Sequence, residues 1–203
     1  MLVTQISEIS NSRCKVYIDQ EFAFVLYKGE LYLYKVAEGK EITQKVYDEL
    51  MNVVLPKRAK LRAMNLLQKR AYTEKQLRNK LAEGFYPEEI MDEAITYVKS
   101  FHYVDDYQYA IDYITSYETR KSCKKLEMEL ITKGVSKMVI EDAFREWENR
   151  GGTQNEVAMI QKLLEKKHYS PECGLKEKNR ICSFLLRRGF PVDKVHEAMR
   201  ISE

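Results

Sequence analysis

One pattern occurs three times along this chain and limits what the chain can fold into. In its first copy, Leu77 and Leu81 lie four residues apart, Gly84 follows, and an aliphatic residue comes six positions later. The second and third copies contain Gly134 and Gly189, so the three glycines lie 50 and 55 residues apart. A repeat of this length is typical of stacked supersecondary units, none of which can bury its apolar face alone.

Three helices are predicted in each repeat. Apolar residues recur three or four positions apart from Ala59 onward, and Thr73 with Gln76 forms a capping box at the start of the second helix. Each glycine is expected to end a second helix, with a positive φ at or next to it. We therefore expect a mainly α fold of three tandem three-helix repeats, over residues 56–104, 105–150 and 151–203.

Two features distinguish the third repeat. Its first helix is expected to start at Thr153, with Glu156 as the capping-box partner. An insertion near residues 168–178 contains a proline and a glycine, which predicts a loop or a broken helix. The buried positions predicted across the three repeats are Ala63, Leu67, Leu77, Leu81, Ile90, Ala94, Ala110, Ile114, Leu126, Leu130, Ile140, Phe144, Ala158, Ile181, Leu185 and Val195.

The first 55 residues do not follow the repeat. Aromatic and branched residues at 16–18, 22–27 and 31–34 predict a small antiparallel sheet of three or four strands, with a hairpin turn at Lys28–Glu30. A helix is expected near residues 42–53, and Pro56 is expected to help end it. The sequence of this extension gives no indication of its function.

The net charge of +3 conceals alternating blocks. Residues 56–82 carry a balance of +8, and residues 83–118 carry −8. In a helical repeat such blocks form basic and acidic stripes, which suit a partner with a polyanionic part and a basic part. Solvated helix faces that bind no partner are the alternative interpretation.

Three features that the sequence lacks bear on the cellular location of the protein. It has no apolar run of 18 residues and no secretory signal pattern at its N-terminus, so no membrane association is expected. Its four cysteines, at 14, 123, 173 and 182, are too scattered for a disulfide framework. These features favour a cytoplasmic protein.

No arrangement of side chains points to catalysis, and a non-enzyme without a cofactor is expected. His168, Cys173, Cys182 and His196 are candidate metal ligands, but no pair has the short spacing of a zinc site, and a core thiol with exposed imidazoles is favoured. The tyrosines between 103 and 117 suggest a stacking platform for single-stranded nucleic acid. Core packing with hydroxyls at the rim is favoured instead, because Tyr113 shares a face with apolar residues.

Basic residues are the strongest candidates for a binding surface, because a string of them can follow a phosphate backbone or an acidic protein groove. Arg58, Arg62 and Lys69 fall within a narrow arc of one helix, and a second group starts the second helix of repeat two. The predicted partner-binding residues are Arg58, Arg62, Lys69, Arg70, Arg120, Lys121, Lys124, Lys125, Arg187 and Arg188.

An ordered set of motifs makes the chain resemble the RecX family of regulatory proteins, which modulate the RecA recombinase. The motifs run through Arg70, Tyr72-Thr73, Gln76-Leu77 and Lys80-Leu81, continue in Phe101-x-Tyr103-Val104-Asp105-Asp106 and in Arg120 to Gly134, and close with Arg188-Gly189-Phe190. The resemblance spans roughly residues 56–200 and is strongest from 63 to 144. The N-terminal sheet resembles an extension found in part of the family.

The resemblance implies an elongated, curved, monomeric array of three-helix units. Such proteins lie along the groove of a RecA filament on DNA and restrain its ATP hydrolysis, strand exchange and coprotease activity, thereby regulating recombination, DNA repair and the SOS response. By position, Arg70, Arg120, Lys124 and Lys125 match basic places in the family pattern. The chain departs from that pattern at Val104, where leucine is commoner, and in the insertion of repeat three.

Two other functions remain open at this stage. A nucleic-acid-binding helical array without a protein target predicts tight, steeply salt-dependent binding to naked DNA or RNA, although the −8 block opposes it. A helical-repeat scaffold with an unrelated protein partner is the third reading.

Overall fold

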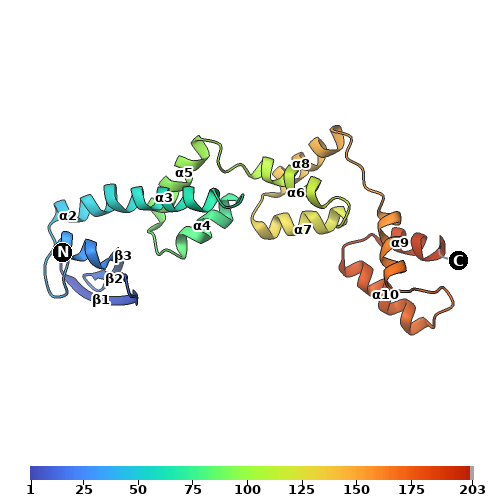
Figure 1. The fold of residues 1–203 in the computed structure, drawn as a ribbon, viewed down its shortest axis with the longest axis horizontal. Coiled ribbons are helices and arrows are strands. Elements are labelled where there is room, and N and C mark those ends of the chain that lie inside the picture. Colours follow the sequence, from blue (N-terminus) through green and yellow to red (C-terminus); the bar gives the residue numbers. More distant parts are fainter. Residues whose placement is uncertain (202–203) are drawn as a thin grey trace. The chain divides into compact units, whose positions relative to one another are not determined.

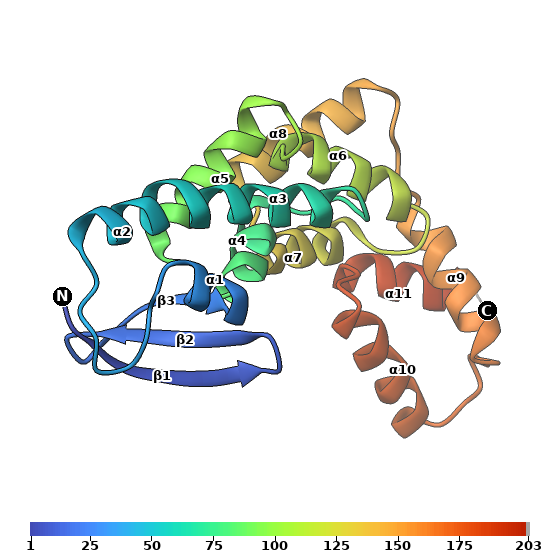
Figure 2. The same ribbon diagram turned by 60° about the vertical axis from the view of Figure 1, so that its left-hand side comes forward.

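The structure is a computed structural model that describes residues 1–201 and divides into two compact units, Met1–Asp105 and Asp106–Glu203. The first unit begins with an antiparallel sheet in the order β1 (Val3–Ser10), β2 (Arg13–Ile18) and β3 (Glu21–Tyr27). Asp19 and Gln20, with φ of 50° and 74°, form the two-residue turn between β2 and β3. Figures 1 and 2 show the sheet along one side of the helix that leads into the first repeat.

The predicted strand at residues 31–34 is wrong, and so is the hairpin turn before it. These residues belong to or follow helix α1 (Lys28–Leu33), and β1, which was not predicted, supplies the third strand. The Glu30 carboxylate accepts a hydrogen bond from Tyr27 N at 2.7 Å and so caps the start of α1. Leu31 packs on the core while its neighbours Tyr32 and Leu33 stay exposed, so the apolar run does not have the alternating burial of a strand.

Pro56 does not end the helix before it. Helix α2 (Gln44–Glu49) continues through a π-helical turn, η1 (Leu50–Val54), into α3 (Leu55–Leu67), and Pro56 lies in the first turn of α3. Proline has no N–H to donate to the carbonyl four residues earlier, and its ring clashes with that carbonyl. The wider turn, in which Leu55 N donates to Leu50 O, lets the chain continue past it.

The first repeat is completed by α4 (Glu74–Ala82) and α5 (Glu88–Ser100). Thr73 and Gln76 form the predicted capping box, and Thr73 is fully buried. After α4 the positive φ falls on Phe85, at 59°, next to Gly84 as expected. At Gly84 itself packing favours glycine, because a Cβ at this position would lie 2.7 Å from the Tyr86 ring and 3.0 Å from the Leu81 carbonyl oxygen.

The second unit contains the other two repeats. The second repeat comprises α6 (Asp106–Tyr117), α7 (Cys123–Lys133) and α8 (Lys137–Asn149), and the third comprises α9 (Glu156–Lys166), α10 (Leu175–Arg187) and α11 (Val192–Ile201). In each repeat the first and third helices lie side by side. Gly134 and Gly189, with φ of 96° and 83°, follow the second helices as predicted.

The start of the third repeat differs from the prediction. Asn155, not Thr153, caps α9, and its side chain accepts a hydrogen bond from Ala158 N at 2.9 Å. Residues 168–174 of the insertion form the predicted loop between α9 and α10, whereas residues 175–178 already belong to α10. Thirteen of the sixteen predicted core residues are buried, whereas Leu67, Phe144 and Ala158 are only partly buried.

Candidate partner-binding surface

Two of the predicted arginines in the first unit are held by contacts within that unit. Arg58 donates from Nη1 to Glu30 Oε2 at 2.8 Å and from Nη2 to the Val25 carbonyl at 2.5 Å, and its guanidinium lies over the rings of Tyr27 and Tyr86. Only 18% of the Arg58 side chain is exposed. Arg58 therefore ties α3 to the end of the sheet, so its fork of donors is already occupied.

The guanidinium of Arg62 also has a partner within the unit. Its Nε and Nη2 donate to the Lys80 carbonyl, near the end of α4, at 3.3 and 3.2 Å. A cation there complements the negative end of the helix dipole. Arg58, Arg62 and Lys69 line one hollow of about 320 Å³, as their shared arc predicted. Lys69 is exposed, and Arg70 is exposed with its guanidinium 4.2 Å from the centre of the Tyr72 ring.

In the second unit, Lys121 belongs to a partly buried network. Its Nζ lies 2.6 Å from Glu129 Oε2, 2.9 Å from the Tyr113 hydroxyl and 4.0 Å from the centre of the Tyr117 ring, and the Tyr113 hydroxyl also donates to Glu129. Both tyrosines pack against the core of the second repeat, as predicted.

The network shifts the pKa of three groups. Burial acts to lower the pKa of Lys121, but the hydrogen bonds to Glu129 and Tyr113 outweigh it and the pKa is raised. Burial acts to raise the pKa of Glu129, but hydrogen bonds from Lys121 and Tyr113 hold it below its ordinary value. The pKa of Tyr113 is raised by burial and by Glu129. Lys121 is thus neutralised locally and adds little to a surface potential.

The other predicted basic residues near the start of α7 are less enclosed than Lys121. Arg120 and Lys124 are exposed, and Lys125 is partly buried with its Nζ 3.8 Å from Glu129. The Gln154 side chain fixes the loop that carries them. Its amide group donates to the carbonyls of Glu118 and Lys121, at 2.5 and 2.7 Å, and its oxygen accepts from Cys123 N at 2.9 Å.

The structure joins the two predicted basic groups of the second unit. Ser122, the fully buried N-cap of α7, donates from its hydroxyl to the Arg188 carbonyl at 2.9 Å. Gly189 makes this approach feasible, because a Cβ there would lie 2.8 Å from Ser122 Oγ and 3.1 Å from Lys125 N. The end of α10 thus rests on the start of α7, which places the backbone of Arg188 and Gly189 against Ser122 and Lys125.

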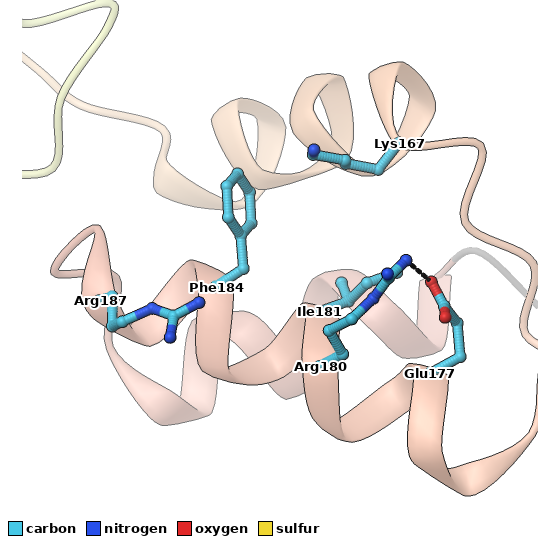
Figure 3. Close-up of a pocket in the computed structure, with 6 residues that line it drawn as sticks. All are labelled: Lys167, Glu177, Arg180, Ile181, Phe184 and Arg187. Atoms are coloured by element: carbon cyan, nitrogen blue, oxygen red, sulfur yellow. Dashed lines mark hydrogen bonds and ion pairs between the residues drawn. The ribbon is translucent and has the colours of Figure 1, made fainter.

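A hollow of about 230 Å³ continues the basic surface within the third repeat (Figure 3). Phe184 forms its apolar wall, with Lys167 Nζ 5.1 Å and the Arg188 guanidinium 4.5 Å from the ring centre. Arg187 lines the hollow, as does Arg180, which is paired with Glu177 at 2.5 Å. The cations that line this hollow give it a positive potential, which attracts an anionic ligand.

The sequence analysis missed Lys167, Arg180 and Phe184. Arg180, Phe184 and Arg187 follow one another at spacings of four and three, so a helical-face analysis of α10 would have found them. Lys167 reaches the hollow from the end of α9, a position that only the packing of α9 on α10 defines.

We use the name unit-two basic surface for Arg120, Lys124, Lys125, Lys167, Arg180, Arg187 and Arg188. Over residues 1–201, no three histidine, cysteine, aspartate or glutamate side chains are grouped so that they could hold a metal ion. Over the same range, no helix is long and apolar enough to cross a membrane.

Comparison with known protein families gives consistent matches. Residues 59–97 match the first three-helix domain of RecX, and residues 154–199 match its third. The regulatory protein RecX of Caldanaerobacter subterraneus subsp. tengcongensis is 31% identical over the full length of both chains. RecX of Clostridium botulinum strain Alaska E43 is 27% identical, over 97% of this chain and 92% of the relative.

Solved structures share the fold. A crystal structure of regulatory protein RecX superposes with a TM-score of 0.63 at 20% identity, covering 98% of both chains. RecX from Lactobacillus salivarius gives a TM-score of 0.60 at 23% identity, covering 73% of this chain and 97% of that one. With a relative at 31% identity along its whole length and two matching family domains, this chain belongs to the RecX family of regulatory proteins.

Proposed function

We propose that this protein binds the RecA recombinase filament on DNA and modulates, chiefly by inhibition, its ATP hydrolysis, strand exchange and coprotease activity. Membership of the RecX family supports the regulatory role, and the motif resemblance supports RecA as its target. In this proposal the protein acts in the cytoplasm as a monomeric non-enzyme that regulates DNA repair, recombination and the SOS response.

The unit-two basic surface is the observation that carries the proposal. A filament on DNA presents phosphates and acidic side chains together, and an extended run of unneutralised cations is attracted to both. Arg120, Lys124 and Arg187 are exposed and have no ion-pair partner among the described residues. We propose that they make the principal contacts, together with Arg188, Lys125, Lys69 and Arg70, while Arg58, Arg62 and Lys121 chiefly hold their neighbours in place.

DNA-dependent ATP hydrolysis by a bacterial RecA tests the proposal. Sub-stoichiometric wild-type protein should slow the reaction. The double variant Lys124→Glu with Arg187→Glu should need at least about tenfold more protein for the same slowing, and its inhibition should depend less steeply on salt. A matched control, Lys137→Glu with Arg145→Glu, makes the same charge change at two exposed side chains of α8.

The control variant should inhibit like wild type. If both double variants lose inhibition equally, net charge and not the proposed surface is responsible. Wild-type protein that fails to slow RecA at equimolar concentration yet binds naked DNA tightly would favour a nucleic-acid-binding array instead. If it does neither, a scaffold for another protein partner becomes the better reading.

A further inference from the structure

The first unit carries a second surface feature, remote in sequence from the repeats. Tyr32 and Leu33, adjacent residues of α1, are 89% and 70% exposed. Leu31 packs on the core and Val36 is buried, and Val36 N donates to Leu31 O at 2.9 Å across the end of α1. This helix-end bond turns the two core residues inward and leaves Tyr32 and Leu33 facing solvent.

These residues border a hollow of about 680 Å³, here called the Tyr32 hollow. Its apolar lining comes from Leu31, Leu33, Val36 and Ala37 beside Tyr32, and three lysines, Lys28, Lys35 and Lys40, complete it. Lys28 is paired with Glu8 at 2.7 Å, but Lys35 and Lys40 have no carboxylate partner among residues 1–201. The hollow therefore combines uncompensated positive charge with exposed apolar surface.

The backbone at Lys35 points to a role for its side chain. Lys35 has a φ of 55°, in the left-handed region that costs an ordinary residue about 1 kcal/mol and that glycine adopts freely. Glycine is the usual residue at such a helix end, and Gly39 fills a left-handed position four residues later in the same loop. Asp19, Gln20, Phe85, His102 and His168 also have a positive φ, so the strain supports a role for Lys35 only because its side chain lines the Tyr32 hollow.

From this hollow we infer that the protein has a docking site for an acidic peptide segment that carries an aliphatic or aromatic side chain. The carboxylates of such a segment would pair with Lys35 and Lys40 while its apolar side chain covers Tyr32 and Leu33. The mostly apolar lining gives a phosphate chain few polar partners, whereas an acidic peptide can match both the lysines and the apolar side chains. The site shares no residue with the unit-two basic surface and requires no RecA.

Fluorescence anisotropy with the full-length protein tests the inference. The ligand is a short labelled peptide in which aspartates and glutamates flank a central leucine–phenylalanine pair. Two matched peptides have either lysines in place of the acids or serines in place of the apolar pair. Only the first should bind tightly, and each matched peptide should bind at least about tenfold more weakly, because both parts of the hollow are needed.

Protein variants assign the binding to the hollow. Tyr32→Ser with Leu33→Ser should weaken binding about tenfold or more, while Met138→Ser, at a side chain 71% exposed on α8, should leave it unchanged. Lys35→Gly is the decisive variant, because it relieves the left-handed strain. It should melt at or above the wild-type temperature and still lose binding several-fold.

Several results would overturn the inference. If the serine-containing peptide binds as tightly as the acidic peptide with the apolar pair, the binding is a non-specific effect of charge. Anionic vesicles or a single-stranded oligonucleotide that bind through Tyr32 and Lys35, in place of the peptide, would assign the hollow to a different ligand class. If Lys35→Gly binds the peptide as wild type does, the Lys35 side chain does not have the proposed function. If the protein self-associates with increasing concentration and the double serine variant does not, the occupant of the hollow is a second copy of this chain. RecA inhibition is measured in parallel, and its loss in wild type would bear on the proposed function alone.

Discussion

Cations of the two units differ in what they contact, although the sequence makes them look alike. In the first unit, Arg58 and Arg62 reach backbone carbonyls and a carboxylate of their own unit. In the second, Lys124 and Arg187 are exposed and have no ion-pair partner among the described residues. Basic residues that look alike in the sequence can therefore stabilise the fold in one place and remain available to a partner in another.

The largest effect is expected at the junction that assembles the unit-two basic surface. Gly189→Ala places a Cβ 2.8 Å from Ser122 Oγ at a φ of 83°, so left-handed strain and overpacking add. We expect a loss of about 2–4 kcal/mol in the free energy of unfolding, measured by urea denaturation. Gly151→Ala is the control, since no atom lies within 4 Å of a Cβ there and only its left-handed φ of 86° opposes the change, which should cost about 1 kcal/mol. Equal losses would mean that the Ser122–Arg188 approach is not tight in solution.

The second prediction tests whether Arg58 is structural. Arg58→Ala leaves the Glu30 carboxylate and the Val25 carbonyl without their partner in a partly buried site, and should cost about 1–3 kcal/mol. Arg58→Lys should recover part of the loss, because it keeps the charge but not the fork. Lys69→Ala, at an exposed lysine of the same arc, should change stability by no more than about 0.5 kcal/mol. If Arg58→Ala matched Lys69→Ala, the contrast between the units would fail.

Local signals in the sequence are sufficient to predict the helices of the three repeats. Thr73 and Gln76, three residues apart, predict a capping box, and that box begins α4. Residues 28–34 were misread because helix α1 depends on the Glu30 cap and on Leu31 packing into a core built from distant segments. The same limit applied to the binding surface. The basic residues were visible, but the Arg58–Val25 bond spans 33 residues and the Ser122–Arg188 bond spans 66, so the occupied cations could not be told from the free ones.

Lys121 is a paired, partly buried cation of the second unit, and the pH dependence of stability tests its bond to Glu129. The folded state lowers the pKa of Glu129, so its contribution to stability is present above the unfolded pKa and is lost as pH falls through the folded value. Lys121 has a raised pKa, and its contribution is lost only as pH rises through that value in the alkaline range. Wild type should therefore exceed Glu129→Gln by about 1 kcal/mol or less at neutral pH, with the gap closing in acid. A gap independent of pH in acid would show that the pair does not form.

The smallest effect on stability is expected where we expect the largest effect on binding. Lys124 and Arg187 are exposed, and neither has an ion-pair partner among the described residues, so reversing both charges removes no intramolecular bond. The added carboxylates also lie in a positive neighbourhood, with Lys125 and Arg188 next to them in sequence, which offsets any cost of the substitution. Lys124→Glu with Arg187→Glu should thus change the free energy of unfolding by no more than about 0.5 kcal/mol, measured by urea denaturation at low and at moderate salt. A loss as large as that of Arg58→Ala would show that these cations brace the second unit, as Arg58 braces the first, and would remove the basis for assigning them to a partner.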